Sequence, residues 1–311
     1  MRTLSQTFID DLSNPSGLLH PILERVKQDH TLMLSIRKSY INIYYRGGNI
    51  LRVKERRNGS YTVFFDHEYN KSGVPSPVLP DAIESRHAAG LWVDSFQQLK
   101  RIMDLYLSKK SKPEREFQQL VARENNFSTI ANQSEYFVSD IEFADSGLGA
   151  RFDILAIRWL ASRRINTCSC RPALIEMKYS DEALKGNAGV LKHLKDINML
   201  LSSGDKYMAL LETMSAQFNQ LDELGLLHFN RAAKWTKIQL DANVKPEVIF
   251  LFANHNPRSS TLNKILSDPE VDAYDNSPKF DLRFYVASFS GYALHEDCML
   301  TLPQFRRLLE K

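Results

Sequence analysis

The chain lacks several features that would place it in a specialised class of protein. It has no run of about 18 apolar residues, so no membrane-spanning helix is expected. Residues 1–17 include acidic side chains and no apolar segment of the signal-peptide type, which leaves the cytoplasm as the expected location. Only three of its 311 residues are cysteine, an odd number that argues against a disulfide scaffold.

Familiar catalytic motifs are missing as well. The sequence has no Walker-type glycine loop, GxSxG elbow, HExxH pair or internal repeat. Cys168 and Cys170 have no second pair or histidine at zinc-ligand spacing, so we interpret them as a loop feature. The formal net charge is only +3, so any contact with a polyanion must depend on local basic patches. With 43% hydrophobic and 25% charged residues, the chain is expected to fold as one large or two modest domains.

Two short apolar stretches carry charges that a purely structural strand would not contain. Residues 150–159 read ARFDILAIRW, and residues 171–179 read RPALIEMKY. Because side chains alternate between the faces of a strand, Glu176 and Lys178 point to the same side. Charged groups rarely enter a core unless they are paired, metal-bound or catalytic. If the strands pair, Asp153 approaches Glu176, and the two carboxylates form an oxygen site suited to Mg²⁺ or Mn²⁺.

An Asp on one strand followed by Glu-x-Lys on the next resembles the PD-(D/E)XK nuclease superfamily. The matching residues are Asp153, Glu176 and Lys178, although Phe152 stands where the superfamily usually has a proline. The superfamily also tends to place a glutamate on the preceding helix. The stretch PEREFQQL supplies Glu114 there, and its sequence is similar to the corresponding run of archaeal Holliday-junction resolvases. The resemblance covers under a third of the chain.

The resemblance implies an α/β fold with a restriction-endonuclease-like mixed sheet flanked by helices. It implies a Mg²⁺- or Mn²⁺-dependent nuclease, most simply a DNA endonuclease of restriction, defence or repair. Asp153, Glu176 and the backbone carbonyl of Met177 would hold the metal, and Glu114 would complete the shell through water or a second ion. Lys178 would orient the attacking water or contact the phosphate. By analogy alone, a homodimer is expected.

Weaker candidates surround this set. Glu116 could also face the site, but the helix dipole favours an exposed first-turn glutamate there. His193, on the helix that follows the second strand, could aim at the site or be a core-edge histidine. Asp140 and Glu142, on a preceding predicted strand, could sit beyond the pocket as additional acids, although an exposed strand face is expected.

Basic residues gather in two further places. Residues 37–57 contain seven Lys or Arg against Glu55 alone, with three tyrosines between them, which predicts a surface where phosphates are neutralised and bases stack. Residues 158–171 contain four arginines and no acid, which predicts a basic loop on the lip of the metal pocket. A solvated hairpin face, or pairing of Arg151 with a carboxylate, explains these residues equally well. The candidate nucleic-acid contacts are Arg46, Arg52, Lys54, Arg151, Arg163 and Arg164.

The alternating pattern of residues 31–70 predicts a small antiparallel sheet, and residues 72–80 (SGVPSPVLP) predict a linker. We therefore expect an N-terminal module at residues 1–110, which binds nucleic acid or a partner protein, and a nuclease domain at residues 111–311. Two rival functions stay open. The protein could bind nucleic acid without cutting it, or it could be an interaction module in which the Asp, Glu and Lys coincide by chance.

Overall fold

The computed structural model describes residues 1–164, 170–186, 189–230, 237–254, 259–287 and 291–310. The chain divides into two compact units, called unit 1 (residues 1–119 and 219–226) and unit 2 (residues 120–218 and 227–311). Each unit contains a five-stranded sheet with helices, so the predicted α/β class is confirmed. The first division falls inside helix α4 (Pro113–Asn126) rather than near residue 111. Among the described residues, no helix combines the length and apolarity needed to cross a membrane.

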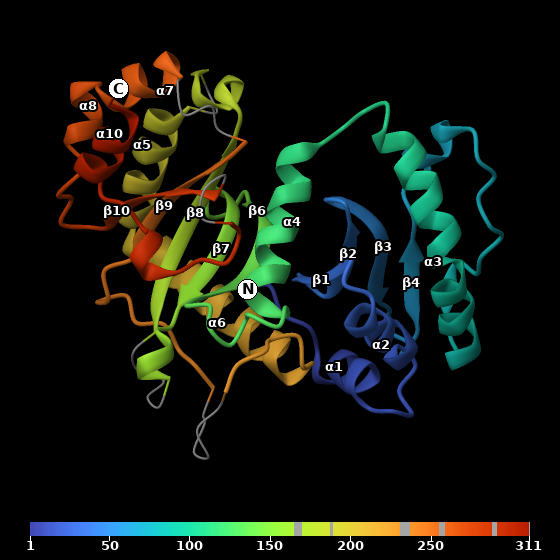
Figure 1. Ribbon diagram of the computed structural model, residues 1–311. Coiled ribbons are helices and arrows are strands. Elements are labelled where there is room, and N and C mark those ends of the chain that lie inside the picture. Colours follow the sequence, from blue (N-terminus) through green and yellow to red (C-terminus); the bar gives the residue numbers. More distant parts are fainter. Residues whose placement is uncertain (165–169, 187–188, 231–236, 255–258, 288–290, 311) are drawn as a thin grey trace. The chain divides into compact units, whose positions relative to one another are not determined.

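The sheet of unit 1 is an antiparallel meander, as the alternating pattern predicts (Figure 1). Its hairpin between β2 and β3 turns at Arg46 and Gly47, whose φ angles of 49° and 69° suit a two-residue turn. In order, the strands are β1 (Leu32–Arg37), β2 (Tyr40–Tyr45), β3 (Gly48–Glu55), β4 (Tyr61–Phe64) and β5 (Ala82–Ile83).

Helices cover this sheet. Near the start of the chain, α1 (Gln6–Ser13), capped by the Ser5 side chain, precedes α2 (His20–Gln28). Residues 72–80 join the 3₁₀ helix η1 (His67–Ser72) to β5, so they connect two elements of unit 1. The long helix α3 (Arg86–Leu107) buries an apolar stripe.

The sheet of unit 2 is mixed. Its order is β10-β9-β8-β7-β6, with antiparallel pairing from β6 to β8 and parallel pairing from β8 to β10. The central strands β8 and β9 are buried along almost their whole length, which explains their continuous apolar runs. The strands are β6 (Tyr136–Asp145), β7 (Ala150–Arg158), β8 (Arg171–Tyr179), β9 (Glu247–Ala253) and β10 (Asp281–Val286).

Aromatic side chains attach the helices of unit 2 to its sheet. Phe305 stacks 5.3 Å from Phe252 and 5.1 Å from Phe284, and Phe218 packs 6.0 Å from Phe137. The helices are α5 (Val190–Leu201), α6 (Gly204–Glu223, shared with unit 1), α7 (Ser260–Leu266), α8 (Pro269–Asp272) and α10 (Leu302–Leu309). The 3₁₀ helices are η2 (Ala161–Arg163), η4 (Asp181–Leu184) and η6 (Glu296–Cys298).

Candidate active site

Strand β8 brings two opposite charges into the interior of unit 2. Glu176 and Lys178 are 1% and 4% exposed, and the Lys178 Nζ lies 3.8 Å from the Glu176 Oε2. They share a face because they are two residues apart, as expected, and they stand in register with Phe250 and Phe252 of β9. Each charge therefore depends on the other, since an isolated buried charge would be costly.

Strand β7 supplies the second carboxylate. The pairing of β7 with β8 ends at Ile154 and Ile175, and just beyond it the Asp153 Oδ2 accepts a hydrogen bond of 2.9 Å from the Met177 backbone N–H. Burial, followed by the charge of Glu176, raises the pKa of Asp153 to about 7. The predicted approach of these two carboxylates is thus reflected in their electrostatics.

Helix α5 adds a histidine to the pair. The His193 Nδ1 lies 3.1 Å from the Glu176 Oε2, and the side chain is 23% exposed. Burial, followed by the charge of Lys178, lowers the pKa of His193 to about 4, so the imidazole is neutral near pH 7. A neutral ring that carries its proton on Nδ1, facing this carboxylate, keeps Nε2 as a hydrogen-bond acceptor. His193 joins the site, where the sequence left a core-edge role open.

These residues fit a hard divalent cation in part. Mg²⁺ is commonly held by one or two carboxylates together with several waters, and Asp153 and Glu176 supply such a pair. The N–H and C=O of a strand residue point to the same neighbour, so the Met177 carbonyl faces the strand of Asp153. Within the described ranges, however, no group of three or more His, Cys, Asp or Glu side chains has metal-site geometry. Water would have to complete the shell.

The predicted acids on α4 belong to unit 1. The Glu116 Oε1 accepts a hydrogen bond of 2.9 Å from the Arg46 Nε, so this carboxylate is engaged within unit 1. Glu114 lies in the first turn of α4, and its role at the metal stays a prediction.

The two acidic residues of strand β6 are more buried than expected. Asp140 is fully buried and accepts a hydrogen bond of 2.9 Å from the Gln217 Nε2 of α6, so the expectation of exposure was wrong for this residue. Glu142 is half-buried with a φ of 50°, and it lies between the register pairs of Ile141 with Ile154 and Phe143 with Phe152. The register of the two strands therefore places Glu142 opposite Asp153.

The four arginines of the basic connection, all of which are described, do not border the candidate site. Arg158 and Arg171 pair at the far end of the β7–β8 hairpin, five residues along β8 from Glu176, or roughly 16 Å. The expected basic lip is therefore wrong, and Arg163 lies at that far end too. Arg164 is buried, donates to the backbone carbonyls of Trp159, Asn132 and Ser134, and lies 4.8 Å from the Phe137 ring. Arg164 thus supports the fold, and we withdraw it from the set of phosphate contacts.

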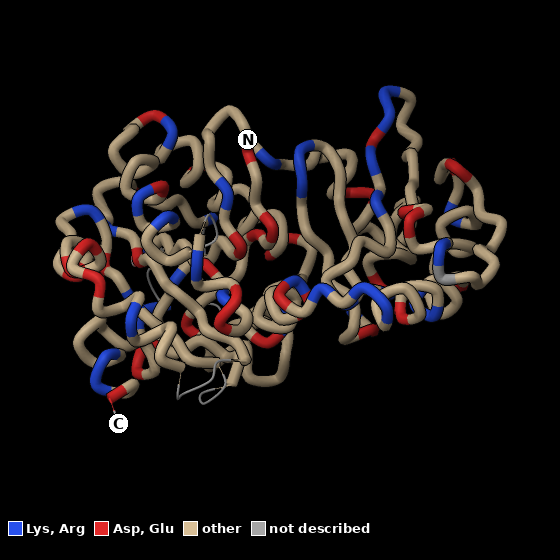
Figure 2. Tube along the Cα trace, turned by 90° about the horizontal axis from the view of Figure 1, so that it is seen from above, with Lys and Arg blue, Asp and Glu red and all other residues tan. Residues whose placement is uncertain are grey.

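Arg151 is exposed two residues before Asp153, on the same face of β7, as expected. In unit 1, Arg46 is bound to Glu116 and to Asp104, at 2.9 Å each, which leaves it a poor phosphate contact. Arg52 lies over the rings of Tyr40 and Phe64, and Lys54 is exposed on the same strand. Lys and Arg are interspersed with Asp and Glu along the chain (Figure 2), in keeping with the small net charge.

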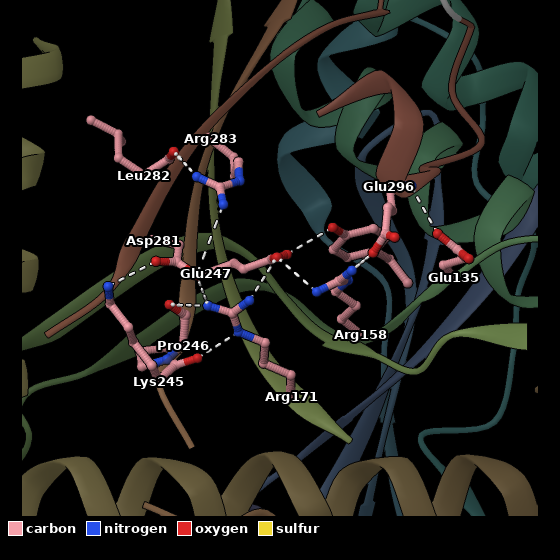
Figure 3. Close-up of polar contacts among 11 residues, drawn as sticks. Glu135, Arg158, Arg171, Lys245, Pro246, Glu247, Asp281, Leu282, Arg283 and Glu296 are labelled. Carbon is pink, nitrogen blue, oxygen red and sulfur yellow. Dashed lines mark hydrogen bonds and ion pairs between the residues drawn. The ribbon is translucent and has the colours of Figure 1, made fainter. Parts of the chain in front are cut away.

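Sequence reasoning missed an ionic cluster around Glu247, at the start of β9 (Figure 3). The Glu247 Oε1 accepts hydrogen bonds of 3.1 Å from Arg158 and from Arg171, and its Oε2 accepts one of 2.7 Å from the Tyr136 hydroxyl. A glutamate opening the otherwise apolar run EVIFLFA was the available signal. Of the two neighbouring cysteines, Cys170 is buried, and Cys168 lies outside the described residues.

Comparison of the chain with protein-family models, with curated proteins and with solved structures finds no match. The geometry of unit 2 is accordingly the basis for the functional proposal below.

Proposed function

We propose that this protein is a metal-dependent nuclease of the PD-(D/E)XK type that hydrolyses phosphodiester bonds in nucleic acid, with DNA as the preferred substrate. The observation that carries the proposal is the cluster of Asp153, Glu176 and Lys178 on two adjacent strands. In it, Glu176 lies 3.8 Å from Lys178 and raises the pKa of Asp153. A restriction-endonuclease-like sheet, a homodimer and a cytoplasmic role in restriction, defence or repair belong to the same proposal.

A bound Mg²⁺ or Mn²⁺ would lower the pKa of a coordinated water and offset negative charge on the phosphate. Asp153 and Glu176 would hold the ion, together with the Met177 carbonyl. Lys178 stands on the same face as Glu176, so its ammonium group can position the attacking water or contact a phosphate oxygen.

His193 and Arg151 have supporting roles in this proposal. The neutral His193 ring donates from Nδ1 to Glu176, which fixes the orientation of that carboxylate. Arg151, exposed beside Asp153, can hold the phosphate backbone of the substrate. In unit 1, the side of the sheet that carries the half-buried Arg52 and the exposed Lys54 offers a separate contact with nucleic acid.

A second candidate is a nucleic-acid-binding or interaction protein that does not cut. The specific observation in its favour is that the charged groups already have protein partners. Asp153 accepts from the Met177 N–H, and Glu176 contacts both Lys178 and His193. A buried network of this kind can persist without a metal, as a structural ion pair does.

The deciding experiment is a cleavage assay with linear and circular duplex DNA, single-stranded DNA and RNA, in Mg²⁺, Mn²⁺ or EDTA. The nuclease should cut in a metal-dependent way, and Lys178→Ala should reduce the rate at least about 100-fold because a charge at the reacting phosphate is lost. Lys264→Ala, which removes an exposed lysine of α7, is the matched control and should cut normally. Nucleic-acid binding in EDTA with no cleavage on any substrate would favour the second candidate.

A further inference from the structure

A cavity of about 390 Å³ opens at the end of the β7–β8 hairpin that lies away from Asp153. Within the described part of the chain, none of the residues that line it is acidic. Leu160 and Val244 supply an apolar wall, and four cations supply the charge: Arg158, Arg163, Arg171 and Lys245. Such a lining favours an anion that also carries an apolar group.

Two of these cations are held rigidly. Arg158 and Arg171 are register partners at the end of the hairpin, and their side chains are 15% and 18% exposed. Both donate to the same Glu247 oxygen at 3.1 Å, and the Tyr136 hydroxyl fixes the other oxygen (Figure 3). Arg171 also donates from Nε to the Lys245 carbonyl. The guanidinium groups are therefore in place before any ligand arrives, which lowers the entropic cost of binding.

The cluster carries more positive than negative charge. Among the described residues, the carboxylates in its ion pairs are Glu247, Asp281 and Glu296, and the cations paired with them are Arg158, Arg171, Lys245 and Arg283. Three negative charges against four positive charges leave an excess of one positive charge, and Arg163 adds a further cation to the lining of the cavity. The acids stand behind the cations, because none of them lines the cavity. A bound anion would thus meet donors first.

Arg158 and Lys245 also keep hydrogen-bond donors that a ligand can use. The two terminal nitrogens of Arg158 each form one ion pair, and each carries a second N–H group. The Lys245 Nζ lies 2.8 Å from the Asp281 Oδ1, and an ammonium group has three donors. Arginine and lysine with free N–H groups are the usual partners of phosphate oxygens.

We propose that this cavity binds a small phosphorylated ligand of about mononucleotide size. Its volume lies within the range of small-molecule sites, the cations suit a phosphate group, and the apolar wall suits a base or sugar. The cavity lies five residues along β8 from Glu176, and alternation turns Arg171 to the opposite face of the sheet. Binding there does not depend on the proposed nuclease reaction.

The test is isothermal titration of the full chain in EDTA with 5′-AMP, inorganic phosphate and adenosine. AMP and phosphate should bind, and adenosine should bind at least about ten-fold more weakly, because the phosphate contacts are charge-assisted. The double variant Arg163→Ala/Lys245→Ala should raise the Kd for AMP at least about ten-fold. Arg307→Ala/Lys264→Ala, which removes one arginine and one lysine from exposed positions outside the cavity, should leave the Kd within about two-fold. Circular dichroism checks that both variants fold.

Several results would overturn the proposal. These are no binding of AMP or phosphate at millimolar concentration, equal binding of AMP and adenosine, and an equal loss in the two double variants. A single-stranded oligonucleotide that binds where AMP does not, and is weakened only by Arg163→Ala/Lys245→Ala, would assign the cavity to a nucleic-acid strand instead. Lys178→Ala should bind AMP like the wild type, so failure of this proposal and failure of the nuclease proposal are separately visible.

Discussion

Replacing Asp153 with asparagine should stabilise the metal-free protein while removing its proposed metal ligand. The pKa of Asp153 is about 7 in the folded chain, against an ordinary value of 3.8, because the carboxylate is buried beside Glu176. The folded protein therefore holds this proton more tightly than the unfolded chain. The stability contributed by this group is complete below about pH 4 and is lost as the pH rises through about 7.

The size of the effect follows from the same shift. Moving a carboxyl pKa from 3.8 to about 7 corresponds to about 4 kcal/mol, at about 1.4 kcal/mol per pKa unit. We expect about half of this, roughly 2 kcal/mol at pH 8, because Asp153 keeps some contact with solvent and its charge is screened. Asparagine retains an oxygen for the Met177 N–H and offers Glu176 a donor in place of a charge.

Urea denaturation in EDTA, followed by tryptophan fluorescence, measures this gain, since Trp159 is fully buried in unit 2. The gain of Asp153→Asn over the wild type should be larger at pH 8 than at pH 5 by about 1 kcal/mol or more. Asp205→Asn, at an exposed position in the first turn of α6, should change stability by no more than about 0.5 kcal/mol at either pH. A gain that is the same at both pH values, or a loss at pH 8, would show that Asp153 does not have a raised pKa in the folded protein.

Three further predictions address the other parts of the account. Glu247→Gln should lower the free energy of unfolding by about 3–5 kcal/mol in urea, because Arg158 and Arg171 lose their shared carboxylate. Glu270→Gln, in an exposed pair, should cost under about 1 kcal/mol, and similar losses in both variants would contradict a structural role for Glu247. His193→Gln, which keeps a donor for Glu176, should cut nucleic acid within about ten-fold of wild type, whereas His193→Phe should be slower than His193→Gln; equal rates would remove His193 from the site. Arg52→Ala/Lys54→Ala should weaken DNA binding in EDTA, measured by fluorescence anisotropy, and should reduce the slope of log K against log salt by about 1–2. An unchanged slope would show that this surface does not contact DNA.

The strands that carry the charged residues were predictable because the information is local. The stretches ARFDILAIRW and RPALIEMKY are short, mainly apolar runs with charged residues at alternating positions, and both form strands of unit 2. The placement of Glu176 and Lys178 on the same face of the strand followed from their spacing of two residues. The position of the basic connection relative to the candidate site could also have been predicted from the sequence. Asp153 stands near the start of one strand and Glu176 near the end of the next, which sets both away from the loop that joins the strands.

The remaining contacts depend on distant parts of the chain. Glu247 is held by arginines 76 and 89 residues away, and no local pattern shows that they converge. The buried Asp140 carboxylate accepts a hydrogen bond from Gln217, 77 residues later. The 3.1 Å contact of His193 with Glu176 depends on where α5 crosses the sheet, which periodicity alone does not determine.

Direct measurement of Mn²⁺ binding tests whether Asp153 and Glu176 together hold a divalent cation. Electron paramagnetic resonance titration at pH 8 should detect bound Mn²⁺ in the wild type and in Lys178→Ala, with affinity lost in Asp153→Asn and in Glu176→Gln. Asp205→Asn should bind like the wild type. Equal Mn²⁺ binding by the wild type and Asp153→Asn, or no binding by either, would contradict the account.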